Sequence, residues 1–290
     1  RLGGERLGMC GVFGIRSLQP DVSRLAYFWL FALQHRGQES AGIAVSDQGR
    51  LTVVRDMGLV AQVFNEQQLH ALPGEVAIGH TRYSTTGANR WANAQPLIHH
   101  GRARTVGHNG NLVNVEELRA ELLADGINPA SGSDSEVIAA LVAREPAPLI
   151  EAVARTMHRL EGAYSVTALV DDTLVAFRDP LGFRPLTVGQ IGDDWVVASE
   201  TCALDLVGAD VVRDVAPGEV VWIDEDGCHS AQAVPRGRGA ACERLSSSAT
   251  WCWPPSARAT GCWPASCAPS ASPRPRPRSY VSSPTTDRSR

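Results

Sequence analysis

The stretch AYSVTALVDDTLVAFRD, residues 163–179, predicts two β-strands joined by a turn. Apolar, aromatic and β-branched residues fill both halves, and Asp171-Asp172 interrupts them at the centre. Further strand patterns occur in AGIAVSDQGRLTVVRD (41–56), which breaks at Asp47-Gln48-Gly49, and in WVVASE (195–200) and GEVVWI (218–223). The sequence therefore predicts strands in both halves of the chain.

Helical periodicity separates these strands, in residues 21–34, 114–124, 135–144 and 149–160. The first of these segments places five apolar residues at helical spacing: Leu25, Phe28, Trp29, Ala32 and Leu33. The second is the clearest helix, because Asn114 can cap it, Glu117 stands three residues on, and Gly126 follows its end. Strands, then helices, then strands indicate an α+β fold in which helices pack against antiparallel sheets.

Composition excludes several classes of protein. The chain of 290 residues is 43% hydrophobic, which is enough for a core, and its formal net charge is only −4. Such a mild charge argues against general binding to nucleic acid or to a membrane surface. No apolar run approaches the roughly 18 residues of a membrane-spanning helix, and no signal-peptide pattern opens the chain. We therefore expect a soluble, cytoplasmic protein with no membrane or nucleic-acid partner.

The chain divides into three parts by texture. Residues 10–242 carry the strand and helix patterns of a folded domain, and residues 1–9 are expected to be a leader or propeptide. Residues 243–290 are rich in Pro, Ser, Ala and Arg and lack periodicity, so we expect this low-complexity tail to be disordered. The seven cysteines form neither a disulfide framework nor paired zinc-ligand spacings, and we expect no metal ligands.

Cys10 is the first candidate for chemistry, since it stands directly after Met9 in MCGVFGI (9–15). A free thiol with a pKa near 8.5 is mostly protonated at neutral pH and needs a base. If Met9 and the residues before it are removed, the α-amine of Cys10, with a pKa near 7.7–8.0, can serve as that base. The alternative is a small, buried strand cysteine, and the stretch alone favours neither interpretation.

Five polar, glycine-containing segments lie beside the strand and helix patterns: QHRGQESAG (34–42), GHTRYSTTG (79–87), NAQP (93–96), GHNGNL (107–112) and SGSDSE (131–136). We expect them to be loops that carry a site. The side-chain amide of Asn109 and the backbone N–H of Gly110 can stabilise an oxyanion, or the pair can simply form a tight turn. Arg82 offers a fork for a carboxylate, and Asp134 can hold an ammonium group or only cap a helix.

The motifs CGVFGI, ALQHRGQESAGIA, IGHTRYSTTG, NAQP, HNGNL and SDSE resemble the glutaminase domain of the class II, N-terminal-nucleophile (Ntn-hydrolase) glutamine amidotransferases. Four further segments favour the glutamine phosphoribosylpyrophosphate amidotransferase (amidophosphoribosyltransferase) branch: DMGLVAQVF (56–64), RDPLGFRPL (178–186), ASETCALD (198–205) and VRDVAPGEVV (212–221). The resemblance covers roughly residues 9–242. It implies a four-layer αββα sandwich and hydrolysis of the glutamine side-chain amide through a γ-glutamyl thioester, which releases ammonia.

The resemblance also implies roles for single residues. Cys10 resembles the nucleophile, with its freed amine as the base, and the mechanism requires that residues 1–9 be removed. Arg82 resembles the residue that binds the α-carboxylate of glutamine, with Thr85 in the same binding loop, and Asp134 resembles the acid that holds the α-ammonium group. The remaining positions with a role are the oxyanion hole, Asn109 and Gly110, and the motif loop near the nucleophile, Arg36 and Gly37.

In family members the ammonia passes to a phosphoribosyltransferase domain, which makes 5-phosphoribosylamine from phosphoribosyl pyrophosphate in the first step of purine biosynthesis. That domain uses Mg²⁺, and some members carry a 4Fe–4S cluster. Here Cys242-Glu243 resembles the start of the connecting segment, but the pattern is lost after it, which points to a shift of reading frame near Glu243.

We therefore expect no cofactor, L-glutamine as substrate, and at most glutamine hydrolysis by this chain alone. The alternative is an inactive, truncated fragment that only associates with an intact amidotransferase. Homo-oligomers occur in the family, and truncation argues against one here.

Overall fold

The computed structural model describes residues 9–17, 22–83, 90–99 and 105–237, which all belong to one unit spanning residues 1–244. The predicted leader (1–9, apart from Met9), Thr85 and the predicted tail (243–290) lie outside the described residues. Among the helices that the structure describes, none is both long enough and apolar enough to cross a membrane.

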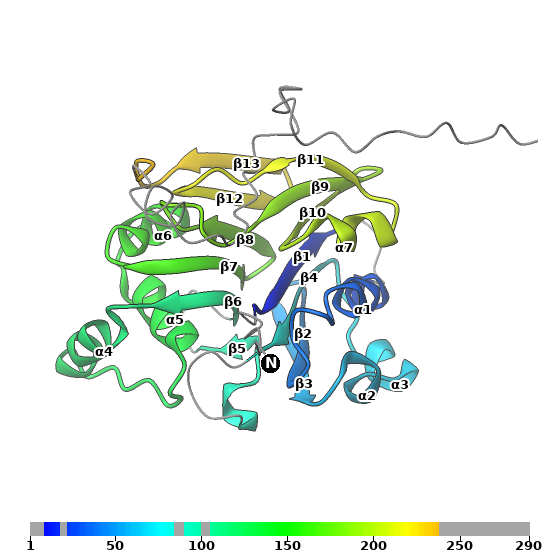
Figure 1. Ribbon diagram of the computed structural model, residues 1–290, viewed down its shortest axis with the longest axis horizontal. Helices are drawn as coiled ribbons and strands as arrows, with labels where there is room; N and C mark the ends of the chain where they lie inside the picture. The colour runs from blue at the N-terminus through cyan, green and yellow to red at the C-terminus, as the bar shows by residue number, and fades with distance from the viewer. Residues whose placement is uncertain (1–8, 18–21, 84–89, 100–104, 238–290) are drawn as a thin grey trace, which may run out of the picture. The chain divides into compact units, whose positions relative to one another are not determined.

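Two antiparallel sheets form the centre of the fold (Figure 1). The first has the order β11-β9-β10-β1-β4-β2-β3, with β11 Asp210–Asp214, β9 Thr187–Ile191, β10 Asp194–Ala198, β1 Gly11–Arg16, β4 Val76–Arg82, β2 Ser40–Asp47 and β3 Arg50–Met57. The second has the order β13-β12-β8-β7-β6-β5, with β13 Gly227–Gln232, β12 Glu219–Asp224, β8 Thr173–Arg178, β7 Gly162–Val170, β6 Thr105–Leu112 and β5 Leu97–Ile98.

Helices cover the outer face of each sheet. The first sheet packs against α1 (Val22–Ala32), α2 (Val60–Val63), α3 (Glu66–His70) and α7 (Thr201–Leu206). The second packs against α4 (Val115–Ala124), α5 (Asp134–Arg144) and α6 (Leu149–Met157). A short 3₁₀ helix, Trp91–Asn93, precedes β5. The order of layers is therefore helix, sheet, sheet, helix, which confirms the α+β prediction and the αββα sandwich.

The alternation of side chains along β1 shows how the layers are held together. Phe13 and Ile15 point to the α1 side, where Phe13 lies against Trp29 with ring centroids 5.1 Å apart. Val12 points the other way, into a core between the two sheets that Leu174 of β8 also enters. A strand with apolar residues on both faces is buried on both faces, as expected at the centre of four layers.

Both predicted hairpins are present. β2 and β3 pair from Ser40–Met57 to Asp47–Arg50, and their turn has positive φ angles at Gln48 (48°) and Gly49 (75°). Two positive φ angles in a two-residue turn match the right-handed twist of the strands it joins. β7 and β8 also form an antiparallel hairpin, which pairs from Ser165–Arg178 to Val170–Thr173 around Asp171-Asp172.

The helix predicted over residues 21–34 is present as α1, and its buried stripe runs through Ala26, Trp29 and Leu30 and leaves Phe28 51% exposed. Two local predictions are wrong. Asn114 does not cap α4 with its side chain, which donates to the carbonyl of Arg159 and accepts from the N–H of Glu161. The side chain instead connects the start of α4 to the segment before β7.

Two of the polar segments predicted as loops lie partly in strands. Residues 79–82 belong to β4 and residues 107–112 to β6, and both are buried along most of their length. Their polar side chains are tolerated in the interior because other groups satisfy them; His80, for example, bonds to the carbonyl of His108 at 3.0 Å. Asn109-Gly110 is therefore no tight turn: Asn109 pairs with Ser165, and Gly110 with Tyr164.

Candidate active site

Cys10 directly precedes β1, whose first residue, Gly11, pairs with Thr81 of β4. This register places Cys10 beside the end of β4. Its Sγ lies 3.5 Å from both the backbone nitrogen and the carbonyl oxygen of Tyr83. The thiol is partly buried, and the pairing of the next residue, Gly11, with Thr81 helps to position it.

Arg36 holds the backbone of Cys10 from the other side. It lies in the turn after α1, and its Nε donates to the carbonyl oxygen of Cys10 at 2.9 Å. Its Nη1 forms an ion pair with Oε1 of Glu200, and the arginine side chain is only 2% exposed. A bidentate guanidinium suits this position, because one side chain binds a carbonyl and a carboxylate together.

Gly37 allows the Arg36 turn to approach β4 closely. A Cβ atom at this position would lie 2.6 Å from backbone atoms of Thr81 and Arg82. Any side chain would therefore push the turn away from the strand. The absence of a side chain at residue 37 keeps Arg36 in reach of Cys10.

Charges of both signs surround the thiol. Burial raises the pKa of Cys10, and Asp134 raises it further, while the backbone of Tyr83 and the cations of Arg82 and Arg36 act in the opposite direction. Arg36, Arg82 and Asp134 therefore lie near enough to influence the pKa of Cys10, and Arg36 also contacts its backbone. Because the net shift is upward, the thiol in this state is protonated at neutral pH.

Arg82 ends β4 and is almost fully buried. Its Nη1 lies 3.1 Å from Oε2 of Glu39, which follows the Arg36 turn. The guanidinium is therefore held at the edge of the site by a carboxylate and keeps a fixed direction. Thr85, predicted to share this binding loop, lies outside the described residues.

Asp134 is the first residue of α5, and Ser133 occupies the N-cap, where its Oγ accepts from the N–H of Ser135 at 3.3 Å. Oδ1 of Asp134 lies 3.2 Å from Nδ1 of His108, and Oδ2 accepts from the N–H of Leu112 at 3.2 Å. Burial raises the pKa of Asp134, but His108 and the backbone N–H groups outweigh it and hold the pKa below its usual range. The carboxylate is thus kept ionised, as a binding site for a cation requires.

His80 and His108 connect the two sheets behind this carboxylate. Nε2 of His80 donates to the carbonyl oxygen of His108 at 3.0 Å, and Oε1 of Gln95 accepts from the His108 N–H at 2.8 Å. Burial lowers the pKa of His80 to about 3. His80 is therefore neutral, and it fixes the strand that carries His108 and Asn109.

Asn109 and Gly110 follow on β6, whose strand contacts β1. Asn109 is fully buried; its Nδ2 lies 3.4 Å from Oγ of Ser165, and its Oδ1 has no partner among the described residues. A Cβ at residue 110 would lie 2.0 Å from the carbonyl oxygen of Ala163. No residue larger than glycine fits there, so no side chain covers the backbone of residue 110.

The sequence predicts no role for Arg184, although it lies in the motif RDPLGFRPL. Burial lowers the pKa of Arg184, while the Cys10 sulfur acts in the opposite direction. The N–H of Arg184 donates to Oδ2 of Asp179 at 3.1 Å, and Asp179 thereby fixes the loop after β8. The sequence also predicts no role for Glu200, because nothing in its motif ASETCALD indicates that it pairs with Arg36.

Residues 80–206 match a family model described as a glutamine amidotransferase domain. Over 245 residues the chain is 48% identical to the amidophosphoribosyltransferase of Mycobacterium tuberculosis, covering 81% of this chain and 46% of that protein. Over 240 residues it is 45% identical to the amidophosphoribosyltransferase of Archaeoglobus fulgidus, covering 81% of this chain and 52% of that protein.

A solved glutamine phosphoribosylpyrophosphate amidotransferase from B. subtilis, complexed with ADP and GMP, superposes with a TM-score of 0.72 at 39% identity. The match covers 78% of this chain and 49% of that chain. The chain therefore spans about half the length of the relatives it matches.

Proposed function

The chain carries the class II glutamine amidotransferase domain of the amidophosphoribosyltransferase family, and we propose that this domain hydrolyses the side-chain amide of glutamine with Cys10 as its nucleophile. The observation that carries the proposal is the placement of Cys10: its carbonyl accepts from Arg36, its Sγ lies 3.5 Å from the backbone of the residue after Arg82, and Arg82 and Asp134 both influence its pKa. A nucleophile flanked by a cation and an anion suits a substrate whose α-carbon bears both charges.

Two charged side chains bind the amino-acid end of glutamine in this proposal. Arg82, held in direction by Glu39, binds the α-carboxylate, and Thr85 contributes from the same segment. Asp134, kept ionised by His108 and by backbone N–H groups, binds the α-ammonium group. The side-chain amide then lies at Cys10, because the two charges fix the other end of the substrate.

The thiol needs a base, because burial raises its pKa. The backbone of Tyr83 is the hydrogen-bonding partner of Sγ in the described part of the chain, and it cannot accept the proton for catalysis. Once the Met9–Cys10 peptide bond is cleaved, the freed α-amine lies next to the thiol and accepts the proton, directly or through a water. Arg36 keeps the backbone of the nucleophile in position through the carbonyl of Cys10.

The thiolate attacks the side-chain carbonyl carbon of glutamine and forms a tetrahedral oxyanion. Asn109 and Gly110 donate N–H groups to that oxygen, which stabilises the negative charge. The α-ammonium group of Cys10 returns its proton to the amide nitrogen, the C–N bond breaks, and ammonia leaves. Water activated by the same amine then hydrolyses the γ-glutamyl thioester, which yields glutamate and restores the thiol.

In the whole protein we propose that the ammonia is consumed by a phosphoribosyltransferase activity, as the name of the relatives implies. For the described domain we propose glutamine hydrolysis alone, with no step that uses Mg²⁺, phosphoribosyl pyrophosphate or an iron–sulfur cluster.

The test compares ammonia and glutamate release from glutamine by the full chain and by Cys10→Ser and Cys228→Ser. Cys228 is a half-buried thiol on β13 and serves as the matched control. We expect release by the wild type and by Cys228→Ser, and none by Cys10→Ser. Release by Cys10→Ser at the wild-type rate would overturn the role of Cys10. A folded wild type without turnover would support the inactive-fragment alternative.

A further inference from the structure

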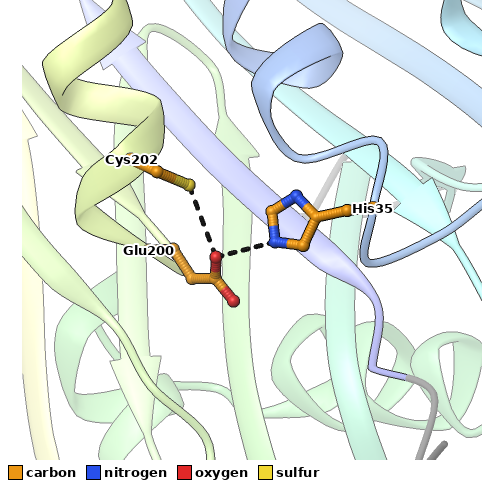
Figure 2. Close-up of side chains that lie close together, drawn as sticks. All are labelled: His35, Glu200 and Cys202. Atoms are coloured by element: carbon orange, nitrogen blue, oxygen red, sulfur yellow. Dashed lines mark hydrogen bonds and ion pairs between the residues drawn. The ribbon is translucent and has the colours of Figure 1, made fainter.

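Beside the proposed active site, three side chains with metal-binding atoms lie together at the surface (Figure 2). They are His35, Glu200 and Cys202, and their ligand atoms all lie within 4.8 Å of one another. We propose that this cluster binds a zinc ion, or a divalent transition metal of similar preference, at a site separate from the glutamine site.

The fold brings these residues together from distant parts of the sequence. His35 follows α1, Glu200 occupies the N-cap position of α7, and Cys202 lies in the first turn of that helix. The two helices share one apolar core, in which Leu204 of α7 and Leu30 of α1 are buried. The backbone that carries the three ligands is therefore held by packing.

The hydrogen bonds of His35 have the pattern of a metal ligand. Its Nδ1 lies 2.9 Å from the carbonyl oxygen of Ala32, and its Nε2 lies 2.9 Å from Oε2 of Glu200. A neutral imidazole carries one N–H, and here both nitrogens face acceptors. In the tautomer that donates from Nδ1 to Ala32, the lone pair of Nε2 points toward the carboxylate of Glu200, so that both groups can bind one metal ion. A backbone carbonyl on the second nitrogen is the usual support of a histidine that binds a metal.

The donor set selects the kind of metal. A thiolate, an imidazole and a carboxylate are ligands of zinc, whereas calcium and magnesium prefer oxygen alone. Ligands about 2.0–2.3 Å from a tetrahedral zinc sit roughly 3.3–3.8 Å apart. Oε2 of Glu200 lies 3.4 Å from Sγ of Cys202, within that range, and 2.9 Å from Nε2 of His35, about 0.4 Å short of it. Small rotations of His35 and Cys202 therefore complete the geometry.

Charge and exposure also fit a bound cation. Glu200 pairs with Arg36 through Oε1, and Oε2 faces His35 and Cys202. The carboxylate can therefore bind Arg36 and a metal with different oxygens. Cys202 binds as the thiolate, its proton leaving to solvent, and supplies a second negative charge. His35 is 55% exposed and Glu200 32% exposed, so solvent can fill the fourth position.

Glu200 links this cluster to the proposed nucleophile. The same carboxylate anchors Arg36, whose Nε holds the carbonyl of Cys10. A single side chain, Arg36, therefore separates the zinc site from the glutamine site. The proposed zinc site and its test do not depend on glutamine hydrolysis.

The test is a titration of the full chain with Co²⁺. Binding is measured by the absorption band for charge transfer from thiolate to cobalt. The background replaces the other cysteines of the C-terminal region with serine, at Cys242, Cys252, Cys262 and Cys267. We expect one equivalent of Co²⁺ and a charge-transfer band that zinc abolishes by displacement. Cys202→Ser should lose the band, and His35→Asn should weaken binding by at least about tenfold, the lower end of what outer-shell partners alone cost. Cys228→Ser should leave the titration unchanged.

A second measurement needs no substitution at the site. Zn²⁺ should slow alkylation of Cys202 by iodoacetamide in the wild-type chain, read by peptide mass, and leave Cys228 as reactive as before. A cobalt band that persists in Cys202→Ser, equal binding by His35→Asn, or alkylation of Cys202 that ignores Zn²⁺ would overturn the proposal.

Discussion

Arg36 donates a hydrogen bond from Nε to the carbonyl oxygen of Cys10 at 2.9 Å, while its Nη1 pairs with Glu200. One buried side chain thus connects the proposed nucleophile with the start of α7. The planar guanidinium of arginine carries several N–H donors in fixed directions, so it can bind both partners at once. The ammonium group of lysine is a single charged centre on a flexible chain and cannot replace it here.

Arg36→Lys should lower kcat for glutamine hydrolysis by roughly 100-fold, because a displacement of about 1 Å at a reacting group has effects of that size. The ammonium group of lysine cannot reach the Cys10 carbonyl and Glu200 together. The control is Arg24→Lys, whose ion pair with Glu66 is exposed. Equal kcat for Arg36→Lys and the wild type would show that the nucleophile does not depend on this contact.

Gly37→Ala should lower the free energy of unfolding by about 1–3 kcal/mol, the typical effect of overpacking. The new Cβ would lie 2.6 Å from the backbone of Thr81 and Arg82, which a strand cannot easily move. Gly132→Ala is the matched control, since a Cβ there meets nothing within 4 Å. Urea denaturation of both variants measures the difference, and identical midpoints would refute the close approach.

Asp134→Asn should reduce kcat/KM for glutamine by roughly 10- to 150-fold, which corresponds to losing one charge-assisted hydrogen bond of about 1.5–3 kcal/mol. Because this contact binds the substrate equally before and during the reaction, the change should appear mainly as a higher KM. Asp125→Asn, an exposed carboxylate paired with Arg144, is the control. An unchanged KM in steady-state kinetics would contradict the assignment of Asp134 to the ammonium group.

His80 should make the fold sensitive to acid. Its pKa is depressed from 6.5 to about 3 in the folded protein, so the unfolded chain binds the proton more tightly. The contribution of His80 to stability is complete above pH 6.5 and is lost as the pH falls toward 3, by up to about 1.4 kcal/mol per pH unit.

The comparison of wild type with His80→Asn isolates this effect. Across pH 6.5 to 4, the unfolding free energy of His80→Asn should fall less steeply than that of the wild type. His70→Asn, a substitution of an exposed histidine, controls for the loss of an imidazole elsewhere. Parallel pH profiles for the wild type and His80→Asn would mean that His80 accepts a proton in the folded state.

Local pattern predicted most of the elements, because their apolar residues follow the period of the structure they adopt. The hairpin at Gln48-Gly49 and the helix that begins near Asp134 are examples. The sequence pattern gave wrong predictions where polar side chains are buried and hydrogen-bonded. His80 and His108 look like loop residues in sequence, and only the pairing across the two sheets shows why they are buried.

The candidate site was predictable to the extent that its motifs are contiguous. The resemblance places Arg36 in a loop near Cys10, and in the structure Arg36 donates to the carbonyl oxygen of Cys10. The partners that come from distant motifs were not predictable, because no spacing links Arg36 to Glu200, 164 residues away. The predicted cap at Asn114 is wrong for the same reason: its side chain donates to the carbonyl of Arg159, which is distant in sequence.

The central claim is that Cys10 acts as an N-terminal nucleophile. The most direct measurement is the intact mass of the purified protein before and after reaction with a diazo-ketone analogue of glutamine, followed by peptide mapping. The account predicts a chain that begins at Cys10 and carries one label on that residue. A chain that is labelled stoichiometrically on another residue, or on Cys10 while Met9 is still attached, would contradict it.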